Sequence, residues 1–393
     1  MNSMRSAESL VAHRVTNGPR AHFFGYYDKN QWDPSDRYLV GLETDFEDRQ
    51  PTANDVARIV RIDTHDTFRL DVVAETRSWC WQQGCMLQWL PGSADEIIYN
   101  DRIGDRFVSV VLSTSTGRRR VLPRPVYTVS GDGTQALSLN FARLATTRPG
   151  YGYEGLIDQW AADAHPASDG IYRMDLATGD HELIVSIDAL ARLDADETMV
   201  GANHWVNHLL YNPSTRRFIF LHRWSRDGRS FRTRMYTAGT DGSDLHRVPI
   251  QDASHFIWFG DEKIIVWART DRFGNAYHVC RDRTDKVDVL GAGILTKNGH
   301  CTVSPDEKWM LTDEYPDGKG DRPLLLYRLS GQGPDEERRL ELGNFRSLPQ
   351  YRGEIRCDLH PRWNRAGTAV CFDSVHEGQR QMYVMDVAAL VAQ

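Results

Sequence analysis

One short pattern recurs along the chain: an apolar strand, a turn rich in Pro, Gly and Asp, and a second apolar strand. A third strand follows most copies, as in "IYRMDLATGD" and "QMYVMDV". Such a unit cannot bury its apolar face alone, so neighbouring copies must stack against one another. The seven copies are "GYYDKNQWDPSDRYLVGLE", "CMLQWLPGSADEIIYND", "VYTVSGDGTQALSLN", "HLLYNPSTRRFIFLHR", "HFIWFGDEKIIVWAR", "HCTVSPDEKWMLTDEY" and "DLHPRWNRAGTAVCFDS".

Short strands at regular spacing, with no convincing long amphipathic helix between them, predict an all-β fold rather than a βαβ fold. We expect a seven-bladed β-propeller with four-stranded blades, forming a single domain over residues 1–393. The last copy runs out after its third strand, whereas "SLVAHRVT" precedes the first blade. This N-terminal segment is therefore expected to supply the missing outer strand and close the ring, which removes an exposed sheet edge.

Composition narrows the function classes. The net charge of −7 and the pI of 6.1 argue against a nucleic-acid binder that works by blanket phosphate neutralisation. The first residues lack the apolar core of a signal peptide, and no apolar run reaches membrane-spanning length. The six cysteines are scattered without a CxxC pair, which suits reduced thiols. The expectation is a cytoplasmic protein with no nucleic-acid or membrane partner.

Histidines gather where the chain leads into the inner strands of the blades. In a propeller, these segments and the loops between second and third strands share one face of the disc. Any one histidine there could be structural, and any one arginine could be a solvated surface residue. Together, however, they predict a binding face. Six histidines lie before five inner strands, namely His22, His204, His208, His255, His300 and His360, and the return loops add Arg102, Arg143, Arg148, Arg223, Arg269, Arg272, Tyr151 and Tyr153.

Several of these stretches resemble the blade motifs of seven-bladed propeller polysaccharide lyases, of the oligogalacturonate lyase and ulvan lyase type. The resemblance spans nearly the whole chain; the blade turns occur in many propellers, whereas the histidines before the inner strands are more specific. It implies an oligosaccharide lyase that cleaves an acidic, uronate-containing glycan by β-elimination. The stretches are "HFFGYYDK", "WQQGCMLQWLP", "HWVNHLLYNPS", "GHCTVSPDEKWMLTDEYP" and "DLHPRWNRAGTAVCFDSVHEGQRQMYVMD".

That chemistry needs a cation to neutralise the uronate carboxylate, a base to take the adjacent proton, and a proton for the leaving oxygen. His208 and His255 are the base candidates, because each stands immediately before an inner strand and should project into the central funnel. Tyr153, in a long insertion of the third blade, is an alternative base or acid. Arg223, with Arg148 second, is the expected carboxylate clamp. Further substrate-binding candidates on the same face are His22, His204 and Arg272.

A metal site is also predicted. His300 and His360 come from adjacent blades, and Asp358 shares strand parity with His360, so the three side chains could converge on one ion. The resemblance to oligogalacturonate lyase, which carries a metal in this region, implies the same. The chain departs from that enzyme's histidine-rich cluster, and Cys301 and Cys357 would favour zinc. Manganese, calcium and zinc are the candidates, with a metal-free tunnel as the alternative.

Two other functions stay open. A glycoside hydrolase would need two carboxylates roughly 5–9.5 Å apart. Acids are available on the return loops, but no pairing is evident. A non-catalytic propeller that binds glycan or protein is favoured by "WCWQQGC", which offers Trp and Gln where a lyase would offer another histidine. The candidate acids are Asp101, Asp313, Glu314 and Asp373.

Overall fold

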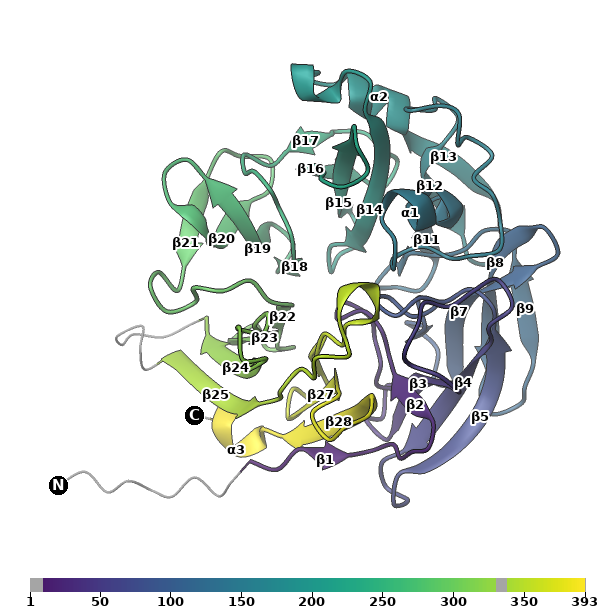
Figure 1. Ribbon diagram of the computed structural model, residues 1–393, viewed down its shortest axis with the longest axis vertical. Helices are drawn as coiled ribbons and strands as arrows, with labels where there is room; N and C mark the ends of the chain where they lie inside the picture. Colours follow the sequence, from purple (N-terminus) through teal and green to yellow (C-terminus); the bar gives the residue numbers. More distant parts are fainter. Residues whose placement is uncertain (1–9, 330–337, 393) are drawn as a thin grey trace.

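The computed structural model describes residues 10–329 and 338–392. The described residues form seven four-stranded antiparallel sheets, which confirms the predicted seven-bladed propeller. Figure 1 shows the sheets arranged in a ring. In each blade the first strand lies nearest the ring's centre and the last lies at its rim, as β18 and β21 illustrate.

The strands of the first four blades follow chain order. They are β2 (Ala21–Phe23), β3 (Tyr38–Thr44), β4 (Ala57–Asp63) and β5 (Arg69–Thr76); β6 (Gln88–Trp89), β7 (Glu96–Ile103), β8 (Arg106–Ser113) and β9 (Arg119–Leu122); β10 (Thr128–Val129), β11 (Gln135–Ser138), β12 (Gly170–Asp175) and β13 (His181–Ser186); and β14 (Asn203–Tyr211), β15 (Arg217–Ser225), β16 (Arg232–Gly239) and β17 (His246–Arg247).

The last three blades complete the ring. Their strands are β18 (Phe256–Phe259), β19 (Lys263–Thr270), β20 (Gly274–Arg281) and β21 (Val287–Leu290); β22 (Thr302–Val303), β23 (Trp309–Asp313), β24 (Pro323–Arg328) and β25 (Arg339–Asn344); and β26 (Arg362–Trp363), β27 (Ala369–Ser374), β28 (Gln381–Asp386) and, from the other end of the chain, β1 (His13–Arg14).

The pairing of β1 with β28 closes the ring. His13 lies opposite Val384 and Arg14 opposite Tyr383 in an antiparallel register. The backbone N–H of Val15 extends the pairing by donating to the carbonyl of Met382 at 2.9 Å. The prediction that the N-terminal segment completes the seventh blade is confirmed, although its first residue, Ser9, lies outside the described residues.

The repeated turn forms because its first polar side chain accepts hydrogen bonds from backbone N–H groups further along the turn. Asp33 accepts from Arg37 N at 2.8 Å and from Tyr38 N at 2.7 Å. Asn364 does the same for Thr368 and Ala369. These bonds satisfy donors that the tight connection would leave unpaired, and they explain why Asp, Ser and Asn recur there.

Helices are few and short. The helix α1, which lies in the long insertion of the third blade, begins after Asn140, whose side chain accepts from Arg143 N at 3.0 Å. No helix in the described part of the chain is long and apolar enough to cross a membrane. The helical segments are α1 (Phe141–Thr147), α2 (Ile187–Arg192), η1 (Glu197–Met199), η3 (Gly353–Ile355) and α3 (Ala388–Val391).

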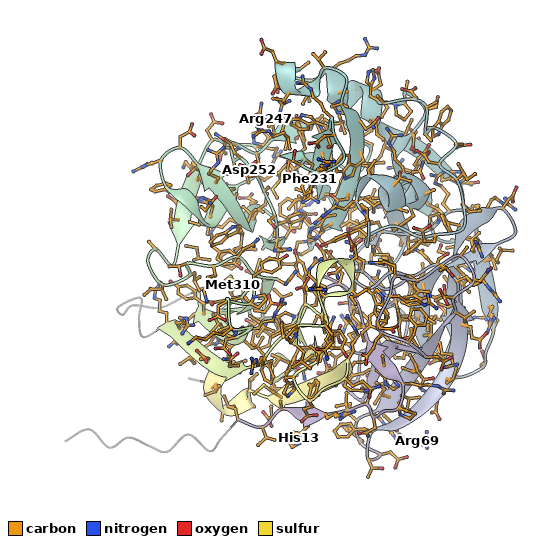
Figure 2. The ribbon with its side chains drawn as sticks, in the orientation of Figure 1. His13, Arg69, Phe231, Arg247, Asp252 and Met310 are labelled. Atoms are coloured by element: carbon orange, nitrogen blue, oxygen red, sulfur yellow. The ribbon has the colours of Figure 1, made fainter. Side chains whose placement is uncertain are left out.

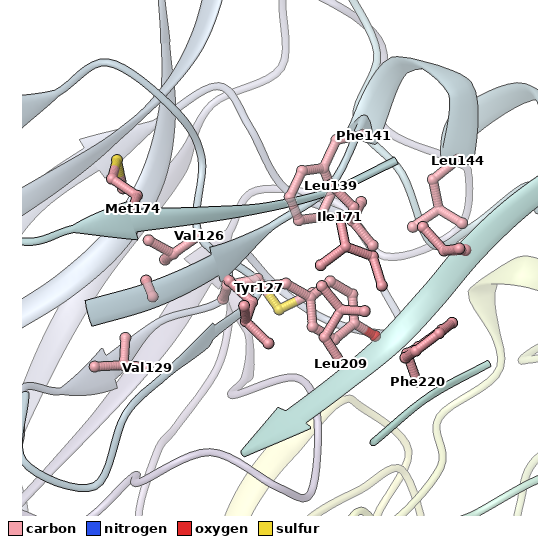
Figure 3. Close-up of a cluster of buried hydrophobic side chains, with 14 of the residues drawn as sticks. Val126, Tyr127, Val129, Leu139, Phe141, Leu144, Ile171, Met174, Leu209 and Phe220 are labelled. Carbon is pink, nitrogen blue, oxygen red and sulfur yellow. The ribbon is translucent and has the colours of Figure 1, made fainter. Parts of the chain in front are cut away.

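The core fills the wedges between neighbouring blades. Figure 3 shows one such cluster, in which Phe141 of the third blade's insertion lies near Leu209 and Phe220 of the fourth blade. Trp79 and Trp81 belong to another wedge, where both are buried and their rings lie 5.1 Å apart. The tryptophans of "WCWQQGC" therefore pack in the core and offer no exposed platform for a sugar ring.

The loop that follows β2 crosses the centre of the ring. The hydroxyl of Tyr27 donates to the carbonyl of Phe256, in the fifth blade, at 3.0 Å. Gly25 permits this path, because its φ is +121° and a Cβ there would lie 2.7 Å from the carbonyl carbon of Gln83. The loop brings its aromatic and charged residues into the tunnel.

Candidate functional site

A cavity of about 290 Å³ opens beside the crossing loop, at the low end of the ~300–1,000 Å³ that ligand pockets occupy. We call it the cationic cavity. Figure 2 labels Phe231 and Asp252, two of the residues that line it. The full lining is Tyr26, Arg148, Tyr151, Asn207, His208, Leu221, Arg223, Phe231, Thr233, Asp252, Ala253, Ser254, His255, Trp267, Asn298 and Tyr315.

Two arginines of this cavity have no acidic partner among residues 10–329 and 338–392. Arg223 is 8% exposed, and its Nε donates only to Thr233 Oγ1 at 3.2 Å. The guanidinium of Arg148 lies over the rings of Tyr151 and Phe231, at 4.7 and 4.9 Å from their centroids. Burial, helped by the charge of Arg148, lowers the pKa of Arg223 to about 10. The cavity thus holds uncompensated positive charge, which favours an anionic ligand.

Two uncharged histidines share the cavity with the arginines. Burial lowers the pKa of His208 to about 4 and holds the pKa of His255 well below its usual range. The Nδ1 of His255 lies 3.0 Å from the Oδ1 of Asn298, whose Nδ2 donates to Ser254 Oγ at 3.2 Å. Since Asn298 Oδ1 can only accept, His255 donates from Nδ1, and its Nε2 keeps a lone pair that can take a proton.

His208 reaches the cavity because its strand is irregular. The pairing of β14 with β15 shifts register between Asn207 and Leu210, and His208 has a φ of +51°. A residue that is not glycine adopts such a conformation only where its surroundings hold it. His360, which precedes β26, likewise has a φ of +44°.

A second group of titratable residues adjoins the cavity, and we call it the His–Asp cluster. The rings of His255 and His300 lie 4.0 Å apart and connect the two regions. The cluster comprises His300, Asp313, Arg322, Arg356, Asp358 and His360, and all of these side chains except that of Arg356 are almost fully buried.

Three residues of the cluster fit a metal ion. Nitrogen atoms of His300 and His360 and a carboxylate oxygen of Asp358 all lie within 4.8 Å of one another. The Nε2 atoms of both histidines are buried without a hydrogen-bond partner. Asp313 Oδ1 lies 2.9 Å from His300 Nδ1 and so fixes the proton there, which leaves Nε2 as a ligand atom. This is the arrangement found behind metal-binding histidines.

Sulfur is not part of this group. Cys301 and Cys357 are both buried, and neither belongs to the set of atoms that converge. Burial raises the pKa of the Cys357 thiol to about 12, which disfavours the thiolate form that binds metals. The geometry therefore favours a site of nitrogen and oxygen ligands over the zinc–thiolate site suggested by these cysteines.

The charges of the His–Asp cluster are paired. Arg322 Nη1 lies 2.7 Å from Asp358 Oδ1 and 3.4 Å from Asp313 Oδ2. On the other side, Arg356 Nε donates to Asp358 Oδ2 at 2.8 Å. Arg356 also donates from Nη2 to the hydroxyl of Tyr151, at 2.8 Å, and so links the cluster to the wall of the cationic cavity.

The structure brings most of the predicted site residues together. His208, His255, Arg148 and Arg223 line the cationic cavity. His300, Asp358 and His360 converge in the cluster beside it.

Tyr153, the alternative base or acid suggested by sequence, is not among the residues that line the cavity. Its side chain is fully buried, stacks on Phe141 at 4.3 Å and accepts a hydrogen bond from Asn100 Nδ2 at 3.0 Å. Tyr151, two residues earlier, lines the cavity instead. The insertion containing α1 is irregular, and strand parity could not tell the two tyrosines apart.

Three predicted substrate contacts also lie outside the cavity lining. His22 is held between Glu43, at 3.1 Å, and Gln381, at 3.0 Å. His204 packs against His222, with their ring nitrogens 2.9 Å apart. Arg272 is exposed in the turn between β19 and β20, with its guanidinium over the neighbouring Phe273 ring. The two histidines are buried among protein partners, and the arginine lies on the surface.

Sequence reasoning missed the crossing loop. Tyr26 lines the cavity, with its ring 4.8 Å from that of His208 and 5.2 Å from that of His360. Asp28 and Lys29 follow it with almost fully buried side chains. The available signal was the charged pair directly after the aromatic run "HFFGYY". Charged residues are rarely buried unless they are paired, so a pair at this position indicates a specific role.

Comparison with known proteins gives a likeness in structure alone. No model of a protein family matches the chain, and no curated protein matches it in sequence. An oligogalacturonate lyase from Vibrio parahaemolyticus is similar in structure, with 14% identity, a TM-score of 0.65 and coverage of 97% of this chain and 95% of that one. An oligogalacturonate lyase in complex with manganese gives 13% identity, a TM-score of 0.68 and coverage of 98% and 97%.

The likeness also extends to other propellers. The tricorn protease is 10% identical with a TM-score of 0.51, over 95% of this chain and 36% of that one. At such identities the comparisons establish the shared propeller fold, and the activity must be argued from the site.

Proposed function

We propose that this protein is a lyase that cleaves a uronate-containing oligosaccharide by β-elimination. The observation that carries the proposal is the cationic cavity, where Arg148 and Arg223 lack acidic partners and face the same space as two neutral histidines, His208 and His255. The structural likeness to two oligogalacturonate lyases over nearly their whole length supports it.

In this mechanism Arg223 and Arg148 bind the uronate carboxylate. Their positive charge stabilises the negative charge that develops as the adjacent carbon loses its proton. His255 takes that proton at Nε2, the C–H electrons form the C4–C5 double bond, and the bond to the leaving oxygen breaks. Tyr26 is protonated at neutral pH, because burial raises its pKa, and can donate to the leaving oxygen.

The His–Asp cluster would hold the divalent cation through His300, Asp358 and His360. When bound, such an ion adds positive charge next to the site of the carboxylate. Two imidazoles and one carboxylate suit manganese or zinc better than calcium, which prefers oxygen ligands throughout. One of the similar lyases is described with manganese.

A glycoside hydrolase is less well supported. Asp252 is the one acidic residue among the described residues that line the cavity, and it pairs with Arg269 at 3.1 Å. Of the acids suggested by sequence, Asp313 and Asp373 are engaged by arginines, at 3.4 and 3.2 Å. The cavity thus lacks the two flanking carboxylates that hydrolysis of a glycosidic bond requires.

The test is ultraviolet absorbance during incubation with a panel of uronate-containing oligosaccharides, since elimination creates a double bond conjugated to the carboxylate and hydrolysis does not. His255→Ala should lower the rate by about 10²–10⁴-fold, the usual contribution of a positioned base. Arg223→Met should lower it by about 10²–10³-fold. The matched control is His65→Ala, at an exposed histidine outside the cavity lining. Tight binding without any unsaturated product would replace the lyase by a glycan-binding propeller.

A further inference from the structure

A buried ion pair lies beneath the cationic cavity, on the loop that crosses the tunnel. Lys29 Nζ is 2.7 Å from Asp28 Oδ1, and the two side chains are 2% and 0% exposed. Such a pair usually stabilises a fold no better than apolar residues of similar size would. Stability alone therefore does not explain why an ion pair is buried next to the cationic cavity.

The second carboxylate oxygen of Asp28 faces His208. Asp28 Oδ2 lies 3.4 Å from His208 Nε2, and within the described residues neither this oxygen nor either ring nitrogen of His208 has another hydrogen-bond partner. The His208 ring stacks on Phe256 at 3.9 Å, and the edges of Tyr26 and Tyr27 enclose it at 4.8 and 5.6 Å. These rings enclose the imidazole, and the 3.4 Å separation is slightly longer than an ordinary hydrogen bond.

The three residues separate two cavities. His208 lines the cationic cavity, whereas Asp28 and Lys29 line a second cavity of about 600 Å³ that also contains Trp258 and Trp363. The ion pair therefore lies between His208 and the second cavity.

We propose that Asp28 and Lys29 are positioning residues, which hold His208 as a neutral imidazole with its proton on Nε2 and a free lone pair on Nδ1. Asp28 accepts a hydrogen bond from the Nε2–H group of His208. Lys29 offsets part of the charge of the carboxylate, so that Asp28 orients the ring while stabilising the imidazolium form less than a lone carboxylate would. The catalytic part of this inference rests on the proposed function. The arrangement of Asp28 and Lys29 would prepare His208 to accept a hydrogen bond or a proton in the cationic cavity.

The charges around His208 agree with this assignment. Burial is the main reason that the pKa of His208 falls to about 4; Asp28 acts in the opposite direction, and Lys29 and Arg223 add to the lowering. The polar and titratable groups that face the ring from the surrounding elements are Asn207 on its own strand, Tyr26, Tyr27, Asp28 and Lys29 on the crossing loop, Arg223 on β15, and His255 before β18.

The first experiment is nitrogen-15 NMR of protein labelled at histidine, in which the protonated and unprotonated ring nitrogens give well-separated signals. The parent protein should show His208 with Nδ1 unprotonated. In Asp28→Asn, the new amide oxygen should keep the hydrogen bond from Lys29. The amide NH₂ group then faces His208 and donates to Nε2. Because Nε2 must accept this bond, the ring proton should move to Nδ1. A variant in which Nδ1 stays unprotonated would overturn the proposal.

The second experiment removes the compensating charge. In Lys29→Met, the lone carboxylate of Asp28 should raise the pKa of His208, and the fraction of imidazolium at a given pH should rise at least about tenfold. An unchanged titration would contradict the role of Lys29. The matched controls are Lys308→Met and Asp306→Asn, which alter an exposed ion pair of 3.2 Å on the sixth blade and should leave His208 unaffected.

The double variant Asp28→Asn/Lys29→Met keeps the experiment decisive if a single variant fails to fold, because it buries no unpaired charge. Without Lys29, the introduced asparagine can turn either its amide oxygen or its amide NH₂ group toward His208, so both ring tautomers should appear. If His208 were protonated on Nε2 alone, the proposal would be wrong. These spectra need no substrate. If no unsaturated product formed, the proposed lyase activity would be wrong. The tautomer of His208 in the parent protein would still test the role of Asp28 and Lys29.

Discussion

The cationic cavity and the His–Asp cluster adjoin one another and contain the same residue types, but they treat charge in opposite ways. In the cluster each guanidinium lies against a carboxylate, as Arg322 does with Asp358 at 2.7 Å. In the cavity, Arg148 and Arg223 have no such partner within the part of the chain that the structure describes. A buried charge without a counter-charge is costly, and such charges gather at functional sites. The difference is what the proposed function requires, with an anionic ligand bound in the cavity and the cluster as its support.

The two regions are joined by Arg356. It donates to Asp358 on one side and to the hydroxyl of Tyr151 on the other, both at 2.8 Å. Tyr151 in turn lies beneath the guanidinium of Arg148. The paired cluster thus fixes the position of the unpaired cation, which is how a rigid framework prepares a binding group.

The largest effect is expected from breaking the paired side. Arg322→Met would leave Asp313 and Asp358 buried with less compensation, and removing one partner of a buried ion pair costs about 3–5 kcal/mol. Denaturant unfolding should show this loss. The control is Arg216→Met, at an exposed pair of 3.6 Å, which should change the free energy of unfolding by no more than about 1 kcal/mol. Equal losses in both variants would mean that the cluster is not the framework described above.

A smaller effect is expected on metal binding. Asp313→Asn keeps the size of the residue but weakens the acceptor behind His300, and such changes lower metal affinity by about 10–100-fold. Titration calorimetry with Mn²⁺ measures this directly, with Asp306→Asn as the control on an exposed turn. If the parent protein binds no Mn²⁺ at all, the metal part of the proposal fails while the cavity stands.

The sequence was enough to predict the blades because the signal for each is local. Strand alternation and the Asp, Asn or Ser of the turn lie within about twenty residues, and closure by β1 followed from a missing fourth strand. The same geometry placed His208 and His255 on one face. It could not foresee that His208 enters the cavity through a bulge, because register irregularities leave no clear mark in a single sequence.

Pairing over long sequence distances was the part that could not be predicted. Asp313, Arg322 and Asp358 come from two blades, and only the folded ring shows that one guanidinium serves both acids. His22 illustrates the converse, since its partner Gln381 lies at the other end of the chain and holds the ring outside the cavity lining. Residue type indicated which side chains could bind or react with a ligand. Hydrogen-bond and ion-pair partners from distant parts of the chain determine which of those side chains stay available.

The smallest effect is expected from removing an unpaired cation. Arg223→Met loses one hydrogen bond to Thr233 but also removes a charge held in a buried site without a counter-ion, and its apolar stem can still pack near Phe231. The free energy of unfolding should therefore change by less than about 1 kcal/mol or even rise, in denaturant unfolding run beside Arg322→Met. A saturating uronate oligosaccharide should stabilise the parent, by about 2.7 kcal/mol at a hundred times its Kd, and stabilise this variant much less. A loss as large as that of Arg322→Met would show that Arg223 belongs to the framework, and the contrast between the two regions would disappear.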